Sequence, residues 1–328
     1  MDKKTKEKAL LNLIYADENY ASIAPGERPD FRVRHKYDGG EFGVEVTEFY
    51  HTESHARLDN IPDYFGEILN HGRYRHKDDL VPLAVKEIEI IRHGRDGPAE
   101  KVPGILTKLP TLEEHVSKIA EVIGGKNRRL GGYLDGLDHV NLIVVDRERR
   151  MVGAPFDAFY GHFFLPRMER VLLDSGFREV YLVAELGPFG SSRQVYLPLK
   201  MLLFVAEAFY FNAVVVAEHA EGCRKQHIDR GWALFAEYMK WRGAKGVQWR
   251  TDPEGDEVVY GNCGLLVSKE GGLIVHDYAD CRLPTDLLPA GDAELACSFG
   301  ERFGEAFDRH RSTHTFTIEL HRDVKKSG

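Results

Sequence analysis

The stretch Arg28-Pro29-Asp30-Phe31, followed at a short distance by Gly43-Val44-Glu45-Val46-Thr47, decides our expectation of the fold. Residues 31–34 predict a strand, residues 38–41 a tight turn, and residues 42–49 the returning strand. Proline suits the first position of a strand, where its missing N–H donor costs little. The sequence therefore predicts a β-hairpin near the amino end of the chain.

This hairpin brings two acidic side chains together. Side chains alternate along a strand, so Glu45 and Thr47 share one face of the returning strand, while Asp30 precedes the first strand. Two carboxylates at one place repel each other unless a proton or a cation lies between them. Oxygen ligands that are this few in number suit Mg²⁺, which keeps several of its waters.

Pro29-Asp30, the hairpin and Glu45-Val46-Thr47 resemble the PD-(D/E)xK superfamily of nucleases. The resemblance implies an α/β, restriction-endonuclease-like fold, a mixed central sheet flanked by helices. It also implies that Asp30, Glu45 and the backbone carbonyl of Val46 hold Mg²⁺ or Mn²⁺. In that family a lysine follows two residues after the second acid, but Thr47 stands at this position. A hydroxyl cannot supply positive charge, so we expect Thr47 to orient a metal-bound water.

A later segment offers a replacement for that lysine. Thr111 and Glu114 form a capping-box pattern, which predicts the start of a helix. Lys126 continues the apolar face of this helix, where a lysine is costly unless it meets an anion. The anion would be the pair Asp30 and Glu45, with the Lys126 ammonium within a few ångströms of them. The face is predicted from helical spacing of Leu112, Val116, Ile119, Ala120 and Ile123.

An alternative for Lys126 stays open at this point. Gly124-Gly125 can kink or end the helix just before it. Lys126 would then begin a solvated basic run over residues 126–129. The two interpretations have about equal weight from the pattern alone.

Residues 6–20 predict an amphipathic first helix. In the resembled family an acidic residue on this helix helps to position metal-bound waters. We assign this role to Glu18, near the end of the predicted helix, ahead of Glu27 in the Pro25-Gly26 turn. Helical glutamates are more often simply exposed, which is the competing interpretation.

The order of the remaining elements predicts a nuclease-like domain over residues 1–200. The segment 52–107 has no clear periodicity and predicts an insertion with short helices over 61–70 and 80–92. Residues 201–328 predict an α+β C-terminal region without an assigned role. Further predicted elements are a buried strand over 140–145, a helix over 156–175, strands over 178–185 and 194–199, a helix over 231–242, a hairpin of 257–268 with 273–278, a helix over 292–309 and a strand over 315–321.

Composition narrows the class of protein. The chain has 328 residues and a formal net charge of −8, which argues against a general nucleic-acid coat but not against a nuclease. Its four cysteines show no CxxC spacing, so neither a zinc site nor a redox pair is indicated. His51 and His55 lie four apart but lack the glutamate of a zincin helix, and predict an exposed pair. No apolar run has membrane-spanning length, and we expect a cytoplasmic protein without a membrane partner.

Together these patterns predict a metal-dependent endonuclease. DNA is the expected partner by analogy with relatives, a restriction or defence role is compatible, and a homodimer stays open. Thr47 motivates one alternative, a catalytically inactive nuclease-like module for binding or assembly. Another alternative places the chemistry beyond Lys200. Acids that point apart, or that form separate salt links with no cavity between them, would contradict the hydrolase prediction.

Overall fold

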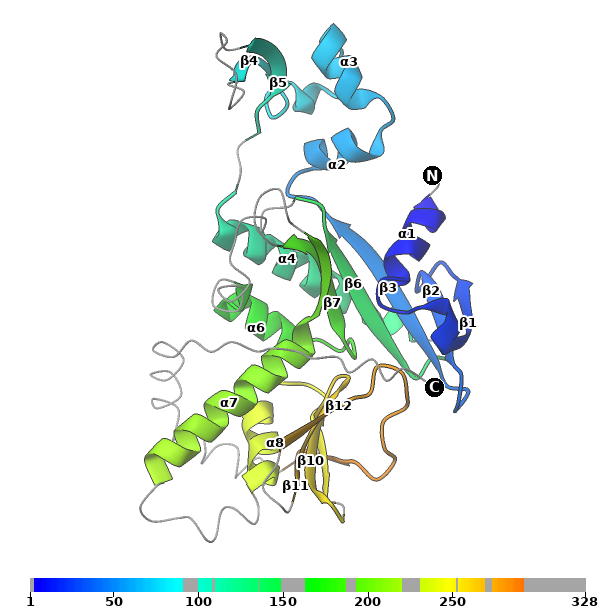
Figure 1. Cartoon of the computed structure of the whole chain (residues 1–328), viewed down its shortest axis with the longest axis vertical. Coiled ribbons are helices and arrows are strands. Elements are labelled where there is room, and N and C mark those ends of the chain that lie inside the picture. Colours follow the sequence, from blue (N-terminus) through cyan, green and yellow to red (C-terminus); the bar gives the residue numbers. More distant parts are fainter. Residues whose placement is uncertain are drawn as a thin grey trace.

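The computed structural model describes residues 3–90, 100–107, 110–134, 136–148, 163–186, 193–219, 231–251, 253–268 and 273–291. A six-stranded sheet with strand order β1-β2-β3-β6-β7-β8 forms its centre (Figure 1). The strands of this sheet are β1 Tyr20–Pro25, β2 Phe31–His35, β3 Glu41–Phe49, β6 His139–Asp146, β7 Val180–Leu186 and β8 Arg193–Pro198.

The central sheet is mixed, as the sequence predicts. Strands β1, β2 and β3 form an antiparallel meander, β6 runs parallel to β3, and β7 runs parallel to β6. Strand β8 returns antiparallel to β7. Strand β1 was not predicted from sequence: Tyr20 was assigned to the end of a first helix, Pro25 to a turn, and the residues between them to no element. That helix, α1, covers only Lys3–Leu11, and the 3₁₀ turn Asp17–Asn19 leads into β1.

Helices cover both faces of this sheet. Helices α4 (Leu112–Asn127) and α6 (Pro166–Leu173) connect the parallel strands and lie on one face, whereas α1 lies on the other (Figure 1). The alternation of β3 side chains matches this division. Val44 and Val46 belong to the hydrophobic cluster beneath α1, and Phe49 belongs to the cluster beneath α4. Odd-numbered residues of β3, Glu45 among them, therefore face α4. Of the predicted helix over 156–175, α6 covers Pro166–Leu173 and is preceded by non-helical residues 164–165, whereas residues 156–162 lie outside the described part of the chain.

Two glycines shape the hairpin. Gly39 has φ +67°, a left-handed conformation that a side chain disfavours, in the turn between β2 and β3. Gly43 allows Pro29 to approach β3, since a Cβ there would lie 2.5 Å from the Pro29 Cγ. This close packing fixes the chain that carries Asp30 against the middle of β3.

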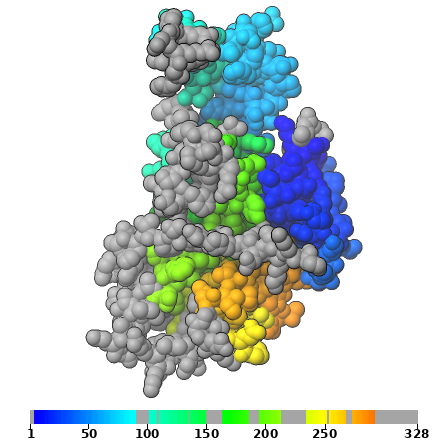
Figure 2. Space-filling model, in the orientation of Figure 1, coloured from blue at the N-terminus to red at the C-terminus, as the bar shows by residue number. Residues whose placement is uncertain are grey.

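The predicted insertion forms a lobe of its own, which projects beyond the carboxyl ends of the parallel strands (Figures 1 and 2). Its small core of Tyr64, Ile68 and Leu83 is separate from the clusters around the central sheet. The predicted helix over 80–92 is wrong. Residues 85–90 form a strand, and charged and apolar residues alternate from Glu87 to Ile90. The elements of the lobe are α2 Glu53–Asn60, α3 Tyr64–His71, β4 Val85–Ile90 and β5 Glu100–Ile105.

A buried acid holds the lobe together. Asp79 is fully buried and accepts hydrogen bonds from Ser54 at 2.7 Å, Tyr64 at 2.7 Å and Arg57 at 2.9 Å. Burial by itself would raise the pKa of Asp79, but these hydrogen bonds outweigh it and keep the pKa below its ordinary value. The carboxylate thus ties α2, α3 and the following turn into one unit.

The C-terminal region adds two helices and a five-stranded antiparallel sheet of order β12-β11-β10-β9-β13. Strand β10 was predicted as the first half of one long strand, but a turn at Gly261 divides that strand into β10 and β11. The predictions over 292–309 and 315–321 lie outside the described residues. The elements are α7 Leu199–His219, α8 Gly231–Trp241, β9 Gln248–Thr251, β10 Gly255–Tyr260, β11 Cys263–Ser268, β12 Leu273–Asp277 and β13 Leu288–Pro289.

The core continues across the predicted domain boundary at residue 200. Phe204 of α7 and Phe235 of α8 stack on each other in the same cluster as Leu142 of β6 and Ile119 of α4. Cutting the chain after Lys200 would expose this cluster to water, so such a deletion would not isolate the chemistry of either part. In the part of the chain that the structure describes, no helix has the length and apolarity needed to cross a membrane.

Candidate active site at the open edge of strand β3

The predicted acids lie where β3 loses its neighbour. Strand β2 pairs with β3 only from Phe31↔Val44 to Arg34↔Glu41, so the later residues of β3 have no β2 partner. Asp30 fills the next position, because its Oδ2 accepts a hydrogen bond from the Val46 N–H at 2.9 Å. A side chain thereby replaces the missing strand, and the Asp30 carboxylate is held against the backbone of β3.

Glu45 meets the lysine that the helical spacing predicted. The Lys126 Nζ, in the last turn of α4, lies 2.6 Å from the Glu45 Oε1. The Glu45 side chain is 8% exposed and that of Lys126 is 20% exposed, so the ion pair is largely removed from water. The other oxygen, Glu45 Oε2, is buried and has no hydrogen-bond partner among the described residues. The alternative of a fully solvated Lys126 is therefore wrong.

The two acids act on one neighbouring side chain. Burial raises the pKa of the Tyr133 hydroxyl, and the negative charges of Glu45 and, more weakly, of Asp30 raise it further. Tyr133 thus stays protonated at neutral pH and can donate a hydrogen bond.

Helix α1 contributes a third acid, but not the predicted one. Lys4 Nζ lies 3.2 Å from Asp30 Oδ1 and 3.2 Å from Glu7 Oε2, and Glu7 is 6% exposed. Glu18 is exposed in the turn before β1, next to Tyr20, which pairs with His35 at the end of β2 away from Asp30. Glu18 therefore lies away from Asp30, and Glu7 is the acid of α1 that shares a lysine with it.

The sequence held a signal for Glu7 that we did not use. Glu7, Leu10, Leu11 and Ile14 recur at i, i+3, i+4 and i+7, the spacing of one buried helical face. Because α1 ends at Leu11, an acid near its middle reaches the sheet, whereas an acid seven residues beyond its end does not.

Hollows open on both sides of Lys126. One has a volume of about 530 Å³ and includes Glu7, Val46, Thr47 and Lys126 in its wall. The other, of about 430 Å³, is lined by Glu27, Arg28, Glu45, Lys126, Arg129, Gly132 and Tyr133. The acids do form separate salt links, with Lys4 and with Lys126, which is half of the arrangement that would contradict a hydrolase. The two hollows lie beside the Glu45–Lys126 pair, and Asp30 is in the wall of neither, so they do not supply a cavity between the two acids.

The donor set fits a hard cation that keeps its waters. No three His, Cys, Asp or Glu side chains within the described ranges come together as a metal-binding group. Two carboxylates and one backbone carbonyl are fewer ligands than a structural zinc or calcium site has, but Mg²⁺ commonly uses one or two carboxylates plus water. The unpartnered Glu45 Oε2 is a buried acceptor that such a cation would satisfy.

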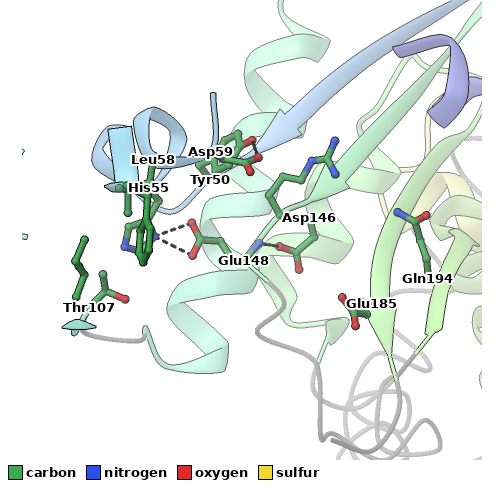
Figure 3. A pocket seen from close by; sticks show the side chains of 12 residues that line it. Tyr50, His55, Leu58, Asp59, Thr107, Asp146, Glu148, Glu185 and Gln194 are labelled. Carbon is green, nitrogen blue, oxygen red and sulfur yellow. Dashed lines mark hydrogen bonds and ion pairs between the residues drawn. The ribbon is translucent and has the colours of Figure 1, made fainter. Parts of the chain in front are cut away.

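A larger hollow of about 910 Å³ lies at the carboxyl ends of β3, β6 and β7, beneath the lobe (Figure 3). Tyr50, Asp146 and Glu185 enter it from the sheet, and His55 and Asp59 from α2. Ligands of open α/β sheets often bind outside the carboxyl ends of strands, so this hollow is a competing candidate.

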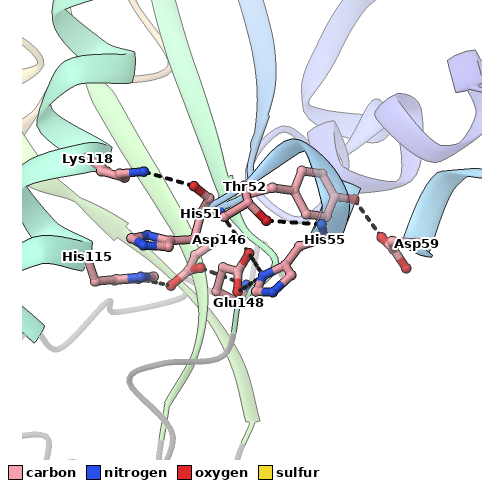
Figure 4. Close-up of polar contacts among 9 residues, drawn as sticks. His51, Thr52, His55, Asp59, His115, Lys118, Asp146 and Glu148 are labelled. Carbon is pink, nitrogen blue, oxygen red and sulfur yellow. Dashed lines mark hydrogen bonds and ion pairs between the residues drawn. The ribbon is translucent and has the colours of Figure 1, made fainter. Parts of the chain in front are cut away.

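The acids behind this hollow are already engaged (Figure 4). His55 Nδ1 lies 2.9 Å from each oxygen of Glu148, and Glu148 Oε1 also accepts the His51 N–H at 2.7 Å. Asp146 Oδ1 accepts the Glu148 N–H at 2.9 Å, and its Oδ2 lies 2.9 Å from His115 Nε2. Since a carboxylate only accepts, His55 Nδ1 carries a proton.

This cluster braces α2 and α4 against the end of β6. The predicted exposed histidine pair is wrong, because the His55 side chain is only 14% exposed and is held by Glu148. Every carboxylate oxygen of Asp146 and Glu148 has a protein partner, and so has each oxygen of Asp30, whereas Glu45 Oε2 has none among the described residues. The unpartnered oxygen of Glu45 makes the open edge of β3 the better candidate for a metal-dependent site.

No family model, curated protein or solved structure matches this chain. The assignment of a function therefore depends on the geometry of the site and on the resemblance of its residues to the nuclease motif.

Proposed function

We propose that the chain is a metal-dependent nuclease of the PD-(D/E)xK type, with a restriction-endonuclease-like fold, that hydrolyses phosphodiester bonds in DNA. The observation that carries this proposal is the 2.6 Å contact between Lys126 and Glu45, which brings in from α4 the positive charge that Thr47 lacks. The element order supports it as well: a first helix, an antiparallel meander of three strands, then a helix and a parallel strand.

Each residue then has a defined task. Asp30, Glu45 and the Val46 carbonyl would hold the cation, with Asp30 oriented by its hydrogen bond to the Val46 N–H. When bound, Mg²⁺ or Mn²⁺ supplies a water of lowered pKa and positive charge beside the phosphoryl oxygens. The Lys126 ammonium places a further positive charge next to the attacking water or the phosphate. Thr47, in the wall of the 530 Å³ hollow, would orient a water.

Two lysines are placed to contact a phosphate-bearing substrate despite the net charge of −8. Lys6 of α1 and Lys126 of α4 line the same hollow, whereas Lys4 is paired with Asp30 and Glu7. DNA, rather than RNA, and a restriction or defence role are proposed from the resemblance alone.

The rival function is a binding or assembly module that has lost catalysis. Two observations favour it: Thr47 stands in the family's lysine position, and each of the two predicted acid ligands already contacts a lysine, Asp30 with Lys4 and Glu45 with Lys126. On this view Lys4 and Lys126 permanently neutralise the acids and leave no role for a cation.

A cleavage assay separates the two functions. The wild type, Asp30→Ala and Glu45→Ala would be incubated with plasmid, single-stranded DNA and RNA in Mg²⁺ and in Mn²⁺. Glu41→Ala is the matched control, because it removes a carboxylate from the same strand that pairs with Arg34 instead of with the site. We expect the wild type and Glu41→Ala to cut DNA and the other two variants to be inactive. A wild type that binds DNA but cuts no substrate in either metal would establish the module.

A further inference from the structure

We propose that the 430 Å³ hollow is a subsite for the phosphate next to the scissile one, and that Arg28 and Arg129 hold that phosphate from opposite elements. This inference rests on the proposed nuclease function, and it assigns a binding role to two residues that the catalytic site does not use. The volume of the hollow lies within the range of about 300–1,000 Å³ that is common for small-molecule sites.

The floor of the hollow belongs to the candidate active site. Glu45 and Tyr133 are both 6% exposed, and Lys126 joins them at the base. The rim consists of exposed residues from two directions: Arg28 comes from the loop before β2, and Arg129 from the turn after α4. A phosphate at the rim would therefore lie directly beside a phosphodiester at Glu45 and Lys126.

The two arginines are available for a ligand. Neither Arg28 nor Arg129 forms a side-chain hydrogen bond or ion pair with any described residue. Most other arginines of the described ranges bind acids or carbonyl groups; examples are Arg57, Arg75, Arg147, Arg178, Arg242, Arg250 and Arg282. The planar guanidinium, with its fork of N–H donors, matches the oxygens of a phosphate in bidentate geometry.

The balance of charges in the wall favours an anion in this hollow. Lys126 and Glu45 neutralise each other at the floor. At the rim, Arg28 and Arg129 face the single acid Glu27, so one positive charge remains without a counterpart in the wall. A phosphate in this hollow is therefore attracted to the arginines at the rim and repelled by the carboxylate of Glu45 at the floor.

The position of Lys126 indicates the path of a bound DNA strand across the site. This residue lines both the 530 Å³ and the 430 Å³ hollows, so the two hollows flank one ammonium group. A DNA strand that crosses Lys126 would place one phosphate at the metal ligands and the following phosphate between Arg28 and Arg129. Positioning the neighbouring phosphate in this way fixes the reacting phosphodiester relative to the attacking water.

The test measures binding without cleavage. Anisotropy of a short fluorescein-labelled single-stranded DNA would be followed in Ca²⁺ between about 50 and 200 mM salt, because each phosphate contact in a single strand adds about 0.7 to the slope of log K against log salt. We expect the double variant Arg28→Ala/Arg129→Ala to lose about 0.7 from this slope, because the two arginines hold one phosphate. The double lysine variant should keep the slope but bind more weakly, because it retains charge without the fork.

The matched control is Arg128→Ala. Arg128 precedes Arg129 and is equally exposed, but its guanidinium lies beside Gly124 and Gly125 on its own helix. This variant should keep the slope and affinity of the wild type. Since Arg28 and Arg129 are both exposed, replacing them should leave the melting temperature unchanged. A lower melting temperature would instead indicate a structural role for the two arginines.

The outcomes separate this subsite from the proposed function. A wild type that binds DNA through the arginines but cuts nothing would overturn the nuclease proposal and leave the subsite standing. A wild type that cuts DNA, with a double alanine variant of unaltered slope and affinity, would overturn the subsite alone. A wild type without measurable DNA binding would overturn both.

Discussion

Replacement of Lys126 by methionine, which keeps the length of the side chain and removes its charge, tests the centre of the proposed site. Two unit charges 2.6 Å apart attract each other by about 6 kcal/mol at an effective dielectric constant near 20. Desolvation of both groups offsets most of this energy. Because the pair is largely but not fully buried, we expect a net loss of about 1–3 kcal/mol in the free energy of unfolding.

The same substitution should reduce cleavage. Removal of one group that stabilises developing charge typically costs about 10²–10³ in kcat, and we expect a loss of this size. Thermal melting and plasmid cleavage in Mg²⁺ would be measured on the same preparations. Lys118→Met is the control, because Lys118 lies on the same helix but donates to the His51 carbonyl at 3.0 Å instead of to a site residue.

A double-variant cycle shows whether the two residues act as a pair. Glu45→Gln in the Lys126→Met background should cost less stability than in the wild type, since the charge it removes is then already unpaired. A Lys126→Met protein that melts and cuts like the wild type would refute the reasoning. Additive effects of the two substitutions on stability would refute the ion pair itself.

Three further predictions follow from the geometry. Thr47→Lys in the Lys126→Met background should recover part of the lost cleavage, because Thr47 and Lys126 line the same hollow; a double variant as inactive as Lys126→Met would contradict a shared role. Asp79→Asn should loosen the lobe by about 1–3 kcal/mol, seen as faster proteolysis of residues 53–90 than of the sheet. The lowered pKa of Asp79 means that its contribution is present above about pH 3.9 and is lost as the pH falls through the folded-state pKa, so the variant should lack this acid dependence. Burial, and then the charge of Arg178, lower the pKa of His139 to about 2, so the unfolded chain binds the extra proton first. Stability from His139 is complete above about pH 6.5 and should fall by up to about 1.4 kcal/mol per pH unit below it; equal slopes for the wild type and His139→Asn would contradict this.

Features with strong local signals were predictable from the sequence. The capping box at Thr111 is present in both directions, with the Thr111 N–H donating to Glu114 at 2.8 Å and the Glu114 N–H donating to Thr111 at 3.1 Å. Helical spacing then placed Lys126 on the correct face, because Gly124 and Gly125 remain within α4. Its position near Glu45 follows from the phase of one regular helix packed on one strand.

Features decided by distant contacts were not predictable in the same way. Strand β1 exists because β2 offers it an edge, a condition that residues 20–25 do not reveal. The wrong length of the first helix then placed Glu18 at the site in place of Glu7. The prediction of a helix over residues 80–92 was wrong for a similar reason. Strand β4 is half-exposed and carries several charged residues, and it forms only against its partner β5.

The separate core of the projecting lobe has a consequence for protein design. Substitutions among Tyr64, Ile68, Leu83 and their neighbours alter a small unit whose packing is independent of the layers around the sheet. Changes in this unit should therefore have little effect on the packing around Asp30 and Glu45. A designer could use the same separation and graft a different segment between β3 and α4.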